Sequence, residues 1–152
     1  MGPVRNLHLP ELTDLSRTER PRAPREMFAR LQFVAALLRE APPTEAHAGG
    51  RLLWRDGQGL VRVLAVDRPL VVGRAPDCGL VLASDRVSRR HCEVAPGGDG
   101  CTLRDLGSSN GTRVNGVELG AGPRPLRDGD VLEAGGVWIA YAIVDTDRRE
   151  AG

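Results

Sequence analysis

The sequence predicts an all-β protein, and three observations support this prediction. From Arg51 onward, apolar residues recur with a period of two along short runs, which is the spacing of strands that bury one face. Turn dipeptides such as Asn-Gly, Asp-Gly and Gly-Gly separate nearly every pair of these runs. Glycine (19) and proline (11) are frequent, whereas aromatic residues make up only 3% of the chain. Many short strands joined by frequent turns are typical of a β-sandwich or barrel.

The predicted strands follow one another closely. They lie at 60–66, 70–72, 80–82, 91–94, 101–104, 131–133 and 137–144. Two of the intervening turns are Asn-Gly pairs, a dipeptide that favours tight hairpins. For Asn115-Gly116 we expect a hairpin turn, and for Asn110-Gly111 a hairpin turn competes with a functional loop.

A helix is predicted before the strands. Met27, Leu31, Val34 and Leu38 recur at helical spacing, and polar residues lie away from this stripe. The amphipathic helix should end at Pro42-Pro43, because proline cannot continue a helix. It either packs its apolar face on the sandwich, the reading we favour, or docks the chain onto a larger assembly.

The chain is thereby divided into five parts. They are a flexible arm (1–24), the helix (25–41), a linker (42–50), the globular domain (51–144) and a charged tail (145–152). The arm contains Thr13 and Thr18, and we consider that either of them, once phosphorylated, could occupy the protein's own binding site and close it.

Composition excludes several functions. The net charge of +1 provides no general attraction to nucleic acid or an anionic membrane. All 21 basic residues are arginine, which excludes a Walker-type phosphate loop and a Schiff-base lysine. It also leaves arginine as the only side chain that can grip a phosphate through a planar fork of donors. We interpret this bias as the mark of a GC-rich bacterial genome, a hypothesis that the coding sequence would test.

The cysteines and the N-terminus bear on location. Cys78, Cys92 and Cys101 are odd in number and irregular in spacing, so we expect no disulfide framework and a reducing compartment. The N-terminal residues contain no long apolar stretch, so we expect neither a secretion signal nor a membrane span. These expectations point to the cytoplasm.

Four short motifs lie at the ends of predicted strands or in the loops that follow. They are Gly73-Arg74, Ser88-Arg89-Arg90-His91, Ser109-Asn110-Gly111-Thr112 and Val114-Asn115-Gly116. Arginine forms charge-assisted bonds to phosphate oxygens, and serine hydroxyls can complete a phosphate cradle. An asparagine amide both donates and accepts, so it can hold a peptide backbone. Together these groups suit a tetrahedral dianion on an extended peptide.

In this order, the motifs resemble those of the forkhead-associated (FHA) domain family. The resemblance extends from Leu70 to Val137 and includes a final Leu-x-x-Gly-Asp at 126–130. It implies an eleven-stranded β-sandwich of two antiparallel-rich sheets, preceded here by the amphipathic helix. It also implies that the domain binds phosphothreonine in partner proteins through loops at one end.

The resemblance further assigns roles to individual residues. It implies that Arg74, Ser88 and Arg89 contact the phosphate, that Ser109 lines the phosphothreonine pocket and that Asn110 holds the peptide backbone after the phosphothreonine. Arg86 is a candidate for recognising a residue downstream of the phosphothreonine, such as an acidic one. The remaining family positions are structural loop residues: Gly73, His91, Gly111, Asn115 and Gly116.

The sequence does not favour an enzymatic function. His91, Cys92 and Asp105 contain the parts of a nucleophile–base–acid set, but adjacent strand residues point to opposite faces. The three cysteines and His91 lack close-pair zinc-ligand spacing. Residues 106–109 lack the flanking glycines of a nucleophile elbow. We therefore expect no catalytic residue, no metal and no cofactor.

The function expected from the sequence is phosphothreonine-dependent protein–protein interaction by a signalling adaptor. Its partners would be phosphothreonine proteins, including a Ser/Thr kinase or its substrates, and neither nucleic acid nor a membrane. The alternative is a scaffold or assembly subunit of a larger complex, such as a secretion or regulatory machine, that works without phosphate.

Overall fold

The computed structural model describes residues 24–43, 48–98 and 100–144. The predicted tail and nearly all of the predicted arm, including Thr13 and Thr18, lie outside these ranges. Part of the predicted linker does so as well. The division of the chain into five parts therefore stays a prediction.

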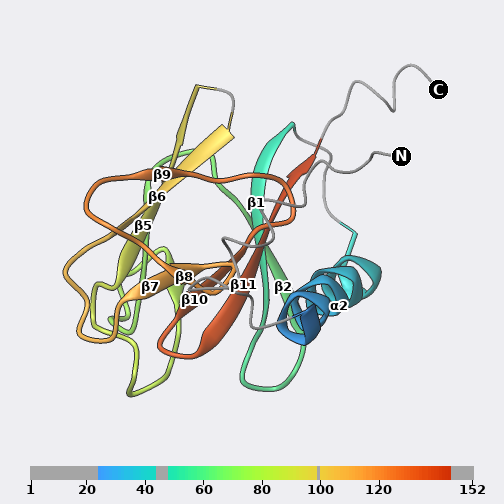
Figure 1. Ribbon diagram of the computed structural model, residues 1–152, viewed down its shortest axis with the longest axis horizontal. Helices are drawn as coiled ribbons and strands as arrows, with labels where there is room; N and C mark the ends of the chain where they lie inside the picture. Colours follow the sequence, from blue (N-terminus) through green and yellow to red (C-terminus); the bar gives the residue numbers. More distant parts are fainter. Residues whose placement is uncertain (1–23, 44–47, 99, 145–152) are drawn as a thin grey trace, which may run out of the picture. The chain divides into compact units, whose positions relative to one another are not determined.

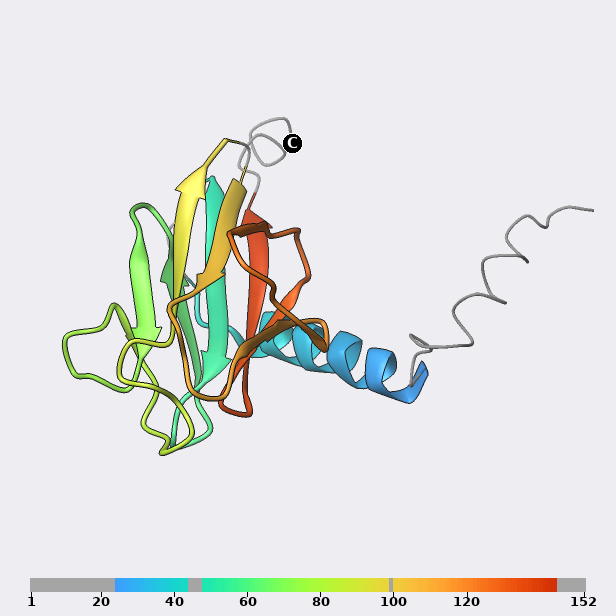
Figure 2. The same cartoon turned by 60° about the vertical axis from the view of Figure 1, so that its left-hand side comes forward.

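The strands form two sheets, which Figures 1 and 2 show as the two layers of a sandwich. The first sheet has the order β2-β1-β11-β10-β7-β8 and the second the order β4-β3-β5-β6-β9. Among the described residues, the strands are β1 (Gly49–Arg55), β2 (Val61–Ala65), β3 (Leu70–Gly73), β4 (Leu80–Val81), β5 (Cys92–Gly97), β6 (Gly100–Asp105), β7 (Thr112–Val114), β8 (Val117–Glu118), β9 (Arg124–Pro125), β10 (Val131–Ala134) and β11 (Val137–Val144). The eleven-stranded sandwich expected from the resemblance is confirmed.

The core lies between the two sheets. Leu52 of β1 and Tyr141 of β11 meet Val72 of β3 and Leu103 of β6 there, and all four are fully buried. Alternation along the strands accounts for this packing: in β6, Cys101 and Leu103 are buried while Thr102 and Arg104 turn away. The pairing is antiparallel throughout the described strands except between β3 and β4, which run parallel.

Four strands were not predicted from the period of the apolar residues. β1 begins at Gly49, before the expected domain start, and four of its residues are buried in succession, so it lacks a period of two. β7, β8 and β9 contain only two or three residues each. A run this short carries too few residues to display alternation, and its partner strand fixes its conformation.

The helix α2 (Pro24–Glu40) was predicted within one residue at each end, but only Val34 of the predicted apolar stripe is among the side chains that pack on the sheet. Leu37 is completely buried, and Phe33, Val34 and Ala41 pack beside it on Leu53 and Ala140. Leu38, a member of the predicted stripe, is 54% exposed. Spacing locates an apolar stripe, but the sheet surface decides which side chains it covers.

Two polar or aromatic contacts accompany this packing of residues 33–40. The ring of Phe33 meets Trp138 of β11 edge-on, with centroids 5.2 Å apart, a favoured geometry for aromatic pairs. Glu40 accepts two bonds from Arg55 of β1, at 2.7 and 3.0 Å. These bonds lower the pKa of Glu40, although the pair is exposed to solvent.

No helix in the described ranges is long and apolar enough to cross a membrane.

Replacing Leu37 by alanine should lower the free energy of unfolding by about 2–5 kcal/mol, because it removes a buried side chain and leaves a cavity. Leu38→Ala is the matched control, and since Leu38 is mostly exposed it should cost about 0.5 kcal/mol or less. Chemical denaturation of the full chain measures both values. Equal effects of the two substitutions would contradict the packing of residues 33–40 described above.

Candidate functional site

Three loops at one end of the sandwich enclose an open hollow. They join β3 to β4, β4 to β5 and β6 to β7, and they lie at the lower left of Figure 1. The hollow has a volume of about 420 Å³ and is lined by Arg74, Asp85, Arg86, Val87, Ser88, Arg89, Arg90, Ser109 and Asn110. The structure thus brings together all five residues predicted to contact a phosphopeptide, and also the specificity candidate Arg86.

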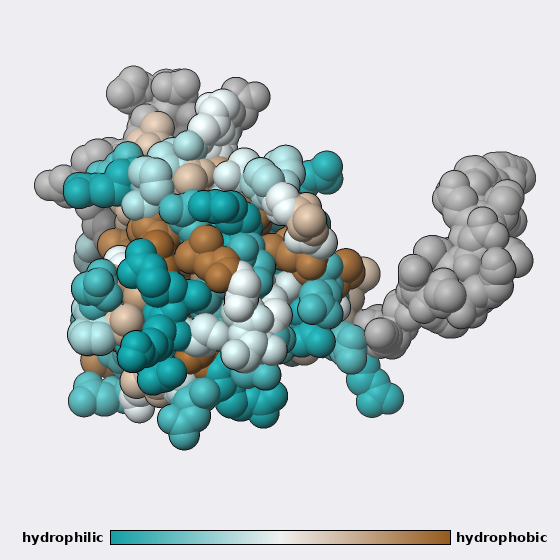
Figure 3. Space-filling view, turned by 90° about the vertical axis from the view of Figure 1, so that its left-hand side faces the viewer, coloured by the Kyte–Doolittle hydropathy of each residue, from teal (hydrophilic) through white to brown (hydrophobic). Residues whose placement is uncertain are grey.

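The hollow carries an excess of positive charge. Four of its lining residues are arginines, whereas only Asp85 is acidic. The loop end of the molecule is mostly hydrophilic at the bottom of Figure 3, below a band of apolar residues. Open clefts lined by one sign of charge concentrate the opposite charge, so this hollow suits an anion.

Arg74 follows the last residue of β3 and is held at its inner end. Its Nε donates to the carbonyl oxygen of Val87 at 3.0 Å. Its backbone N–H donates to the carbonyl oxygen of Ser88 at 2.9 Å. Within the described part of the chain, its two terminal amino groups have no partner. A guanidinium fixed in this way can present two parallel donors to an oxyanion.

Ser88 and Ser109 are linked across two loops. The backbone N–H of Ser109 donates to the Ser88 hydroxyl oxygen at 3.0 Å. A hydroxyl carries one donor and two acceptor positions, so the Ser88 proton stays available. The contact orients that hydroxyl in the hollow and leaves its donor for a ligand.

Asn110 is tied to the backbone of Arg86. Its Nδ2 donates to the Arg86 carbonyl oxygen at 2.7 Å, and its Oδ1 has no donor among the described residues. Both side chains are exposed at the hollow. The amide retains one N–H and its oxygen for a second partner, which is the donor and acceptor pair of an extended peptide.

Gly73 is required by close backbone approach rather than by a turn. It ends β3, and a β-carbon there would overlap the carbonyl oxygen of Arg89 and lie 2.8 Å from the carbonyl carbon. That oxygen accepts bonds from the N–H of Ala75 at 3.1 Å and the thiol of Cys78 at 3.2 Å. The missing side chain lets the β4–β5 loop lie against β3.

His91 connects two of the three loops from a fully buried position. Its Nδ1 accepts the backbone N–H of Ser88 at 3.0 Å, and its Nε2 lies 2.8 Å from the carbonyl oxygen of Gly111. These partners require the neutral ring with its proton on Nε2. At Gly111, φ is +81°, which lies in the left-handed region that favours glycine. Asn110-Gly111 forms no hairpin turn, because β6 and β7 belong to different sheets.

Asp105, considered only as part of a catalytic set, organises the β6–β7 loop. It accepts the backbone N–H groups of Gly107 and Ser108 and the hydroxyls of Ser108 and Thr112, at 2.6 to 2.9 Å. Burial alone would raise the pKa of Asp105, but these hydrogen bonds outweigh it and lower the pKa below its ordinary value. The available signal was Asp105 two and three residues before Gly107 and Ser108, a spacing that favours side-chain capping of a turn.

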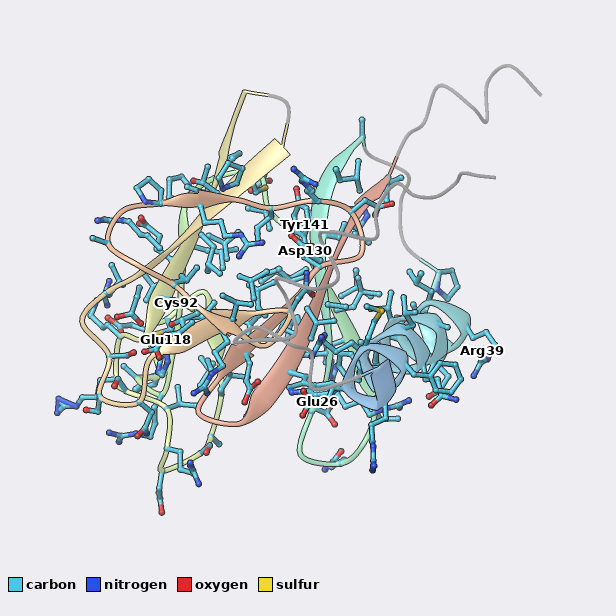
Figure 4. The ribbon with its side chains drawn as sticks, viewed as in Figure 1. Glu26, Arg39, Cys92, Glu118, Asp130 and Tyr141 are labelled. Carbon is cyan, nitrogen blue, oxygen red and sulfur yellow. The ribbon has the colours of Figure 1, made fainter. Side chains whose placement is uncertain are left out.

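Two turns of the first sheet, at Asn115-Gly116 and Gly135-Gly136, contain residues with positive φ. Asn115 and Gly116, with φ of 53° and 85°, form a tight hairpin between β7 and β8. The amide of Asn115 donates to buried Asp130 at 3.0 Å, and Figure 4 shows Asp130 close to Tyr141. The expected turn at Gly135-Gly136 joins β10 to β11, but its contact with the β4–β5 loop was not predicted: a β-carbon on Gly135 would lie 2.6 Å from the Arg86 carbonyl oxygen.

The geometry offers no nucleophile at His91 and Cys92. Cys92 is buried in the core between the sheets, and burial raises the pKa of its thiol to about 12. Both ring nitrogens of His91 already have backbone partners. In the described ranges, no three His, Cys, Asp or Glu side chains come close enough to hold a metal ion.

Known proteins share this sequence pattern and fold. The FHA domain pattern matches residues 70–135. The chain is 31% identical over 118 residues to the ABC transporter ATP-binding/permease protein Rv1747 of Mycobacterium tuberculosis, covering 72% of this chain and 13% of that protein. It is 43% identical over 70 residues to FhaB of Mycolicibacterium smegmatis, covering 45% of each. The chain thus spans less than half the length of these curated relatives.

Solved structures of FHA domains are also similar to this chain. One FHA domain, from a study of phosphothreonine-dependent FHA domain interactions, is 33% identical with a TM-score of 0.55, and the match covers 63% of this chain and 97% of that one. The FhaA FHA domain, complexed with the intracellular domain of Rv3910, is 34% identical with a TM-score of 0.52, over 61% and 99% of the chains. A β-sandwich with a cationic hollow on its end loops defines the class. The chain belongs to the FHA domain family, whose domain is a non-enzymatic interaction module.

Replacing Gly73 by alanine should lower the free energy of unfolding by about 1–3 kcal/mol, because the new β-carbon overlaps the Arg89 backbone. Gly120→Ala is the control, since no atom lies within 4 Å of a β-carbon there. Denaturation and amide chemical shifts of residues 86–91 measure the effect. Unshifted amides in a folded Gly73 variant would refute the close approach.

Replacing Asp105 by asparagine should lower the free energy of unfolding at neutral pH by about 1 kcal/mol, since the lost bonds are half exposed. Because folding lowers the pKa of Asp105, its stabilisation is complete above the ordinary value of 3.8 and is lost as pH falls through the lower folded pKa. The gap between wild type and variant should therefore narrow in strong acid. Denaturation series at several pH values test this, with exposed Asp67→Asn as control; a gap independent of pH would oppose it.

Proposed function

We propose that the chain is a phosphothreonine-dependent interaction module that acts as a non-enzymatic signalling adaptor. The loop-end hollow holds the phosphothreonine, and the flanking peptide extends over the loops. Arg74, Ser88 and Arg89 contact the phosphate, Ser109 lines the pocket around the phosphothreonine side chain, and Asn110 binds the peptide backbone.

One observation supports this proposal most strongly: the side chains of Arg74 and Ser88 are held in place, but their remaining donors have no partner among the residues that the structure describes. The guanidinium is fixed through Nε, and the hydroxyl is fixed through its oxygen, so both keep their remaining protons for a ligand. Donors that are already oriented lose little conformational entropy when they bind. A phosphate monoester carries nearly two negative charges and three acceptor oxygens, and it matches these donors.

The peptide backbone has a matching partner in Asn110. Its unused Oδ1 and second N–H can accept and donate at once to the residue after the phosphothreonine. The same amide bonds to the backbone of Arg86, so Arg86 lies beside the downstream part of the peptide. An acidic residue there would pair with its guanidinium.

The relatives support the kind of partner. One solved relative belongs to a study of phosphothreonine-dependent FHA domain interactions, and another is complexed with the intracellular domain of a second protein. For this chain we propose phosphothreonine proteins of cytoplasmic Ser/Thr kinase signalling, either a kinase or its substrates. A net charge of +1 supports neither nucleic acid nor a membrane as the partner.

Selective capture from a phosphothreonine peptide library tests the function. Full-length protein should retain phosphothreonine peptides and neglect phosphoserine and unphosphorylated controls. Arg74→Ala or Ser88→Ala should each weaken binding about 10- to 200-fold, because each removes about 1.5–3 kcal/mol of hydrogen bonding to a charged group. Calorimetry with one captured peptide measures the loss.

Arg104→Ala provides the matched control. Arg104 pairs with Glu93 at 3.1 Å on the outer face of the second sheet and does not line the hollow. It should bind the captured peptide like wild type. Unchanged affinity in a folded Arg74→Ala protein would contradict the assigned role, and a library with no phosphate-dependent capture would favour the scaffold alternative.

A further inference from the structure

A second groove adjoins the hollow along β3. It has a volume of about 560 Å³ and shares Arg90 with the hollow. Its apolar lining comes from the β2–β3 region, namely Leu64, Ala65, Pro69, Leu70 and Val71. Arg86, Ser109 and Asn110 do not line it.

The chemistry of the groove differs from that of the hollow. Its charged lining residues are two aspartates and two arginines, so their charges balance, whereas arginines dominate the hollow. Arg90, at the shared boundary, pairs loosely with Asp77 at 3.8 Å. A neutral apolar side chain suits this groove better than an anion, because apolar contact is favourable and no net charge attracts an ion.

A glycine keeps the floor of the groove accessible. A β-carbon on Gly79 would lie 2.9 Å from the β-carbon of Leu70. Leu70 and Val71 are both half-buried rather than covered. The absence of a side chain at Gly79 therefore leaves part of the apolar surface of Leu70 open to a ligand.

We propose that the groove binds an apolar side chain of the same phosphopeptide, two or three residues before the phosphothreonine. This inference rests on the proposed function. Asn110 and Arg86 hold the peptide after the phosphothreonine and lie outside the groove, so the groove is left to the preceding residues. Continuity with the hollow at Arg90 favours this occupant over a separate partner.

The length of β3 sets the position. Val71 precedes Arg74 by three residues along an extended strand, which corresponds to about 10 Å. β3 lies between β4 and β5, so the peptide lies over the outer face of the sheet, and an extended peptide running in the direction of β3 covers that distance in about three residues. The preferred residue should therefore be a leucine, isoleucine, valine or methionine at the second or third position before the phosphothreonine.

Paired synthetic phosphothreonine peptides test the proposal on the full-length chain. They differ only in carrying leucine, alanine or aspartate at each of those two positions. Leucine at one of them should bind about three- to tenfold more tightly than alanine, which corresponds to partial burial of one side chain. Fluorescence polarisation measures the affinities.

Val71→Thr should abolish the preference for leucine over alanine. Threonine has a similar shape and favours strands, so the domain should fold, but its hydroxyl disfavours apolar contact. Val81→Thr is the matched control: Val81 is an exposed valine of the neighbouring strand and lines neither cavity. It should keep the leucine preference in full.

The outcomes separate this inference from the proposed function. Phosphate-dependent binding with equal affinity for leucine, alanine and aspartate peptides would overturn the groove and leave the proposed function standing. A change in oligomeric state on Val71→Thr, with the leucine preference intact, would assign the groove to a second copy and overturn the inference too. Failure of every phosphopeptide to bind would overturn both the proposed function and the inference about the groove.

Discussion

The buried imidazole of His91 is the contact on which the binding end depends. It joins the N–H of Ser88 to the carbonyl of Gly111, and so it fixes the β4–β5 loop relative to the β6–β7 loop. The bond from Ser109 to the Ser88 hydroxyl and that from Asn110 to Arg86 span the same two loops. Without the ring, two partly buried backbone groups would lose their partners, which costs up to about 1–3 kcal/mol each. Loop positions, rather than loop residues alone, make the hollow.

The sandwich separates stability from recognition. Apolar side chains fill the space between the sheets, and residues 33–41 cover the outer surface formed by β1 and β11. Charged groups that face the hollow come almost entirely from loops. Because these groups remain exposed, their substitution changes binding more than folding. The converse holds for Leu37 and Gly73, whose contacts are with the fold itself.

The hollow and the groove together describe an elongated recognition surface. In the proposed complex, the arginine-rich hollow provides strong, charge-assisted contacts that depend on the phosphate, whereas the groove provides weaker apolar contact that depends on the peptide sequence. Affinity and specificity then arise from different parts of one ligand. This division suits an adaptor, since phosphorylation switches binding while the flanking residues choose among phosphoproteins.

Local sequence determined the fold class, the helix and the residues of the hollow. Alternation, turn dipeptides and ordered motifs are properties of neighbouring residues, and they placed Arg74, Ser88 and Asn110 at strand ends. Only the tertiary structure decided the rest. It selected Leu37 over Leu38 for burial, gave Asp105 four donors, and set Gly135 against Arg86. These contacts join segments whose relative positions depend on packing between the sheets. No local sequence pattern encodes the distance between such segments.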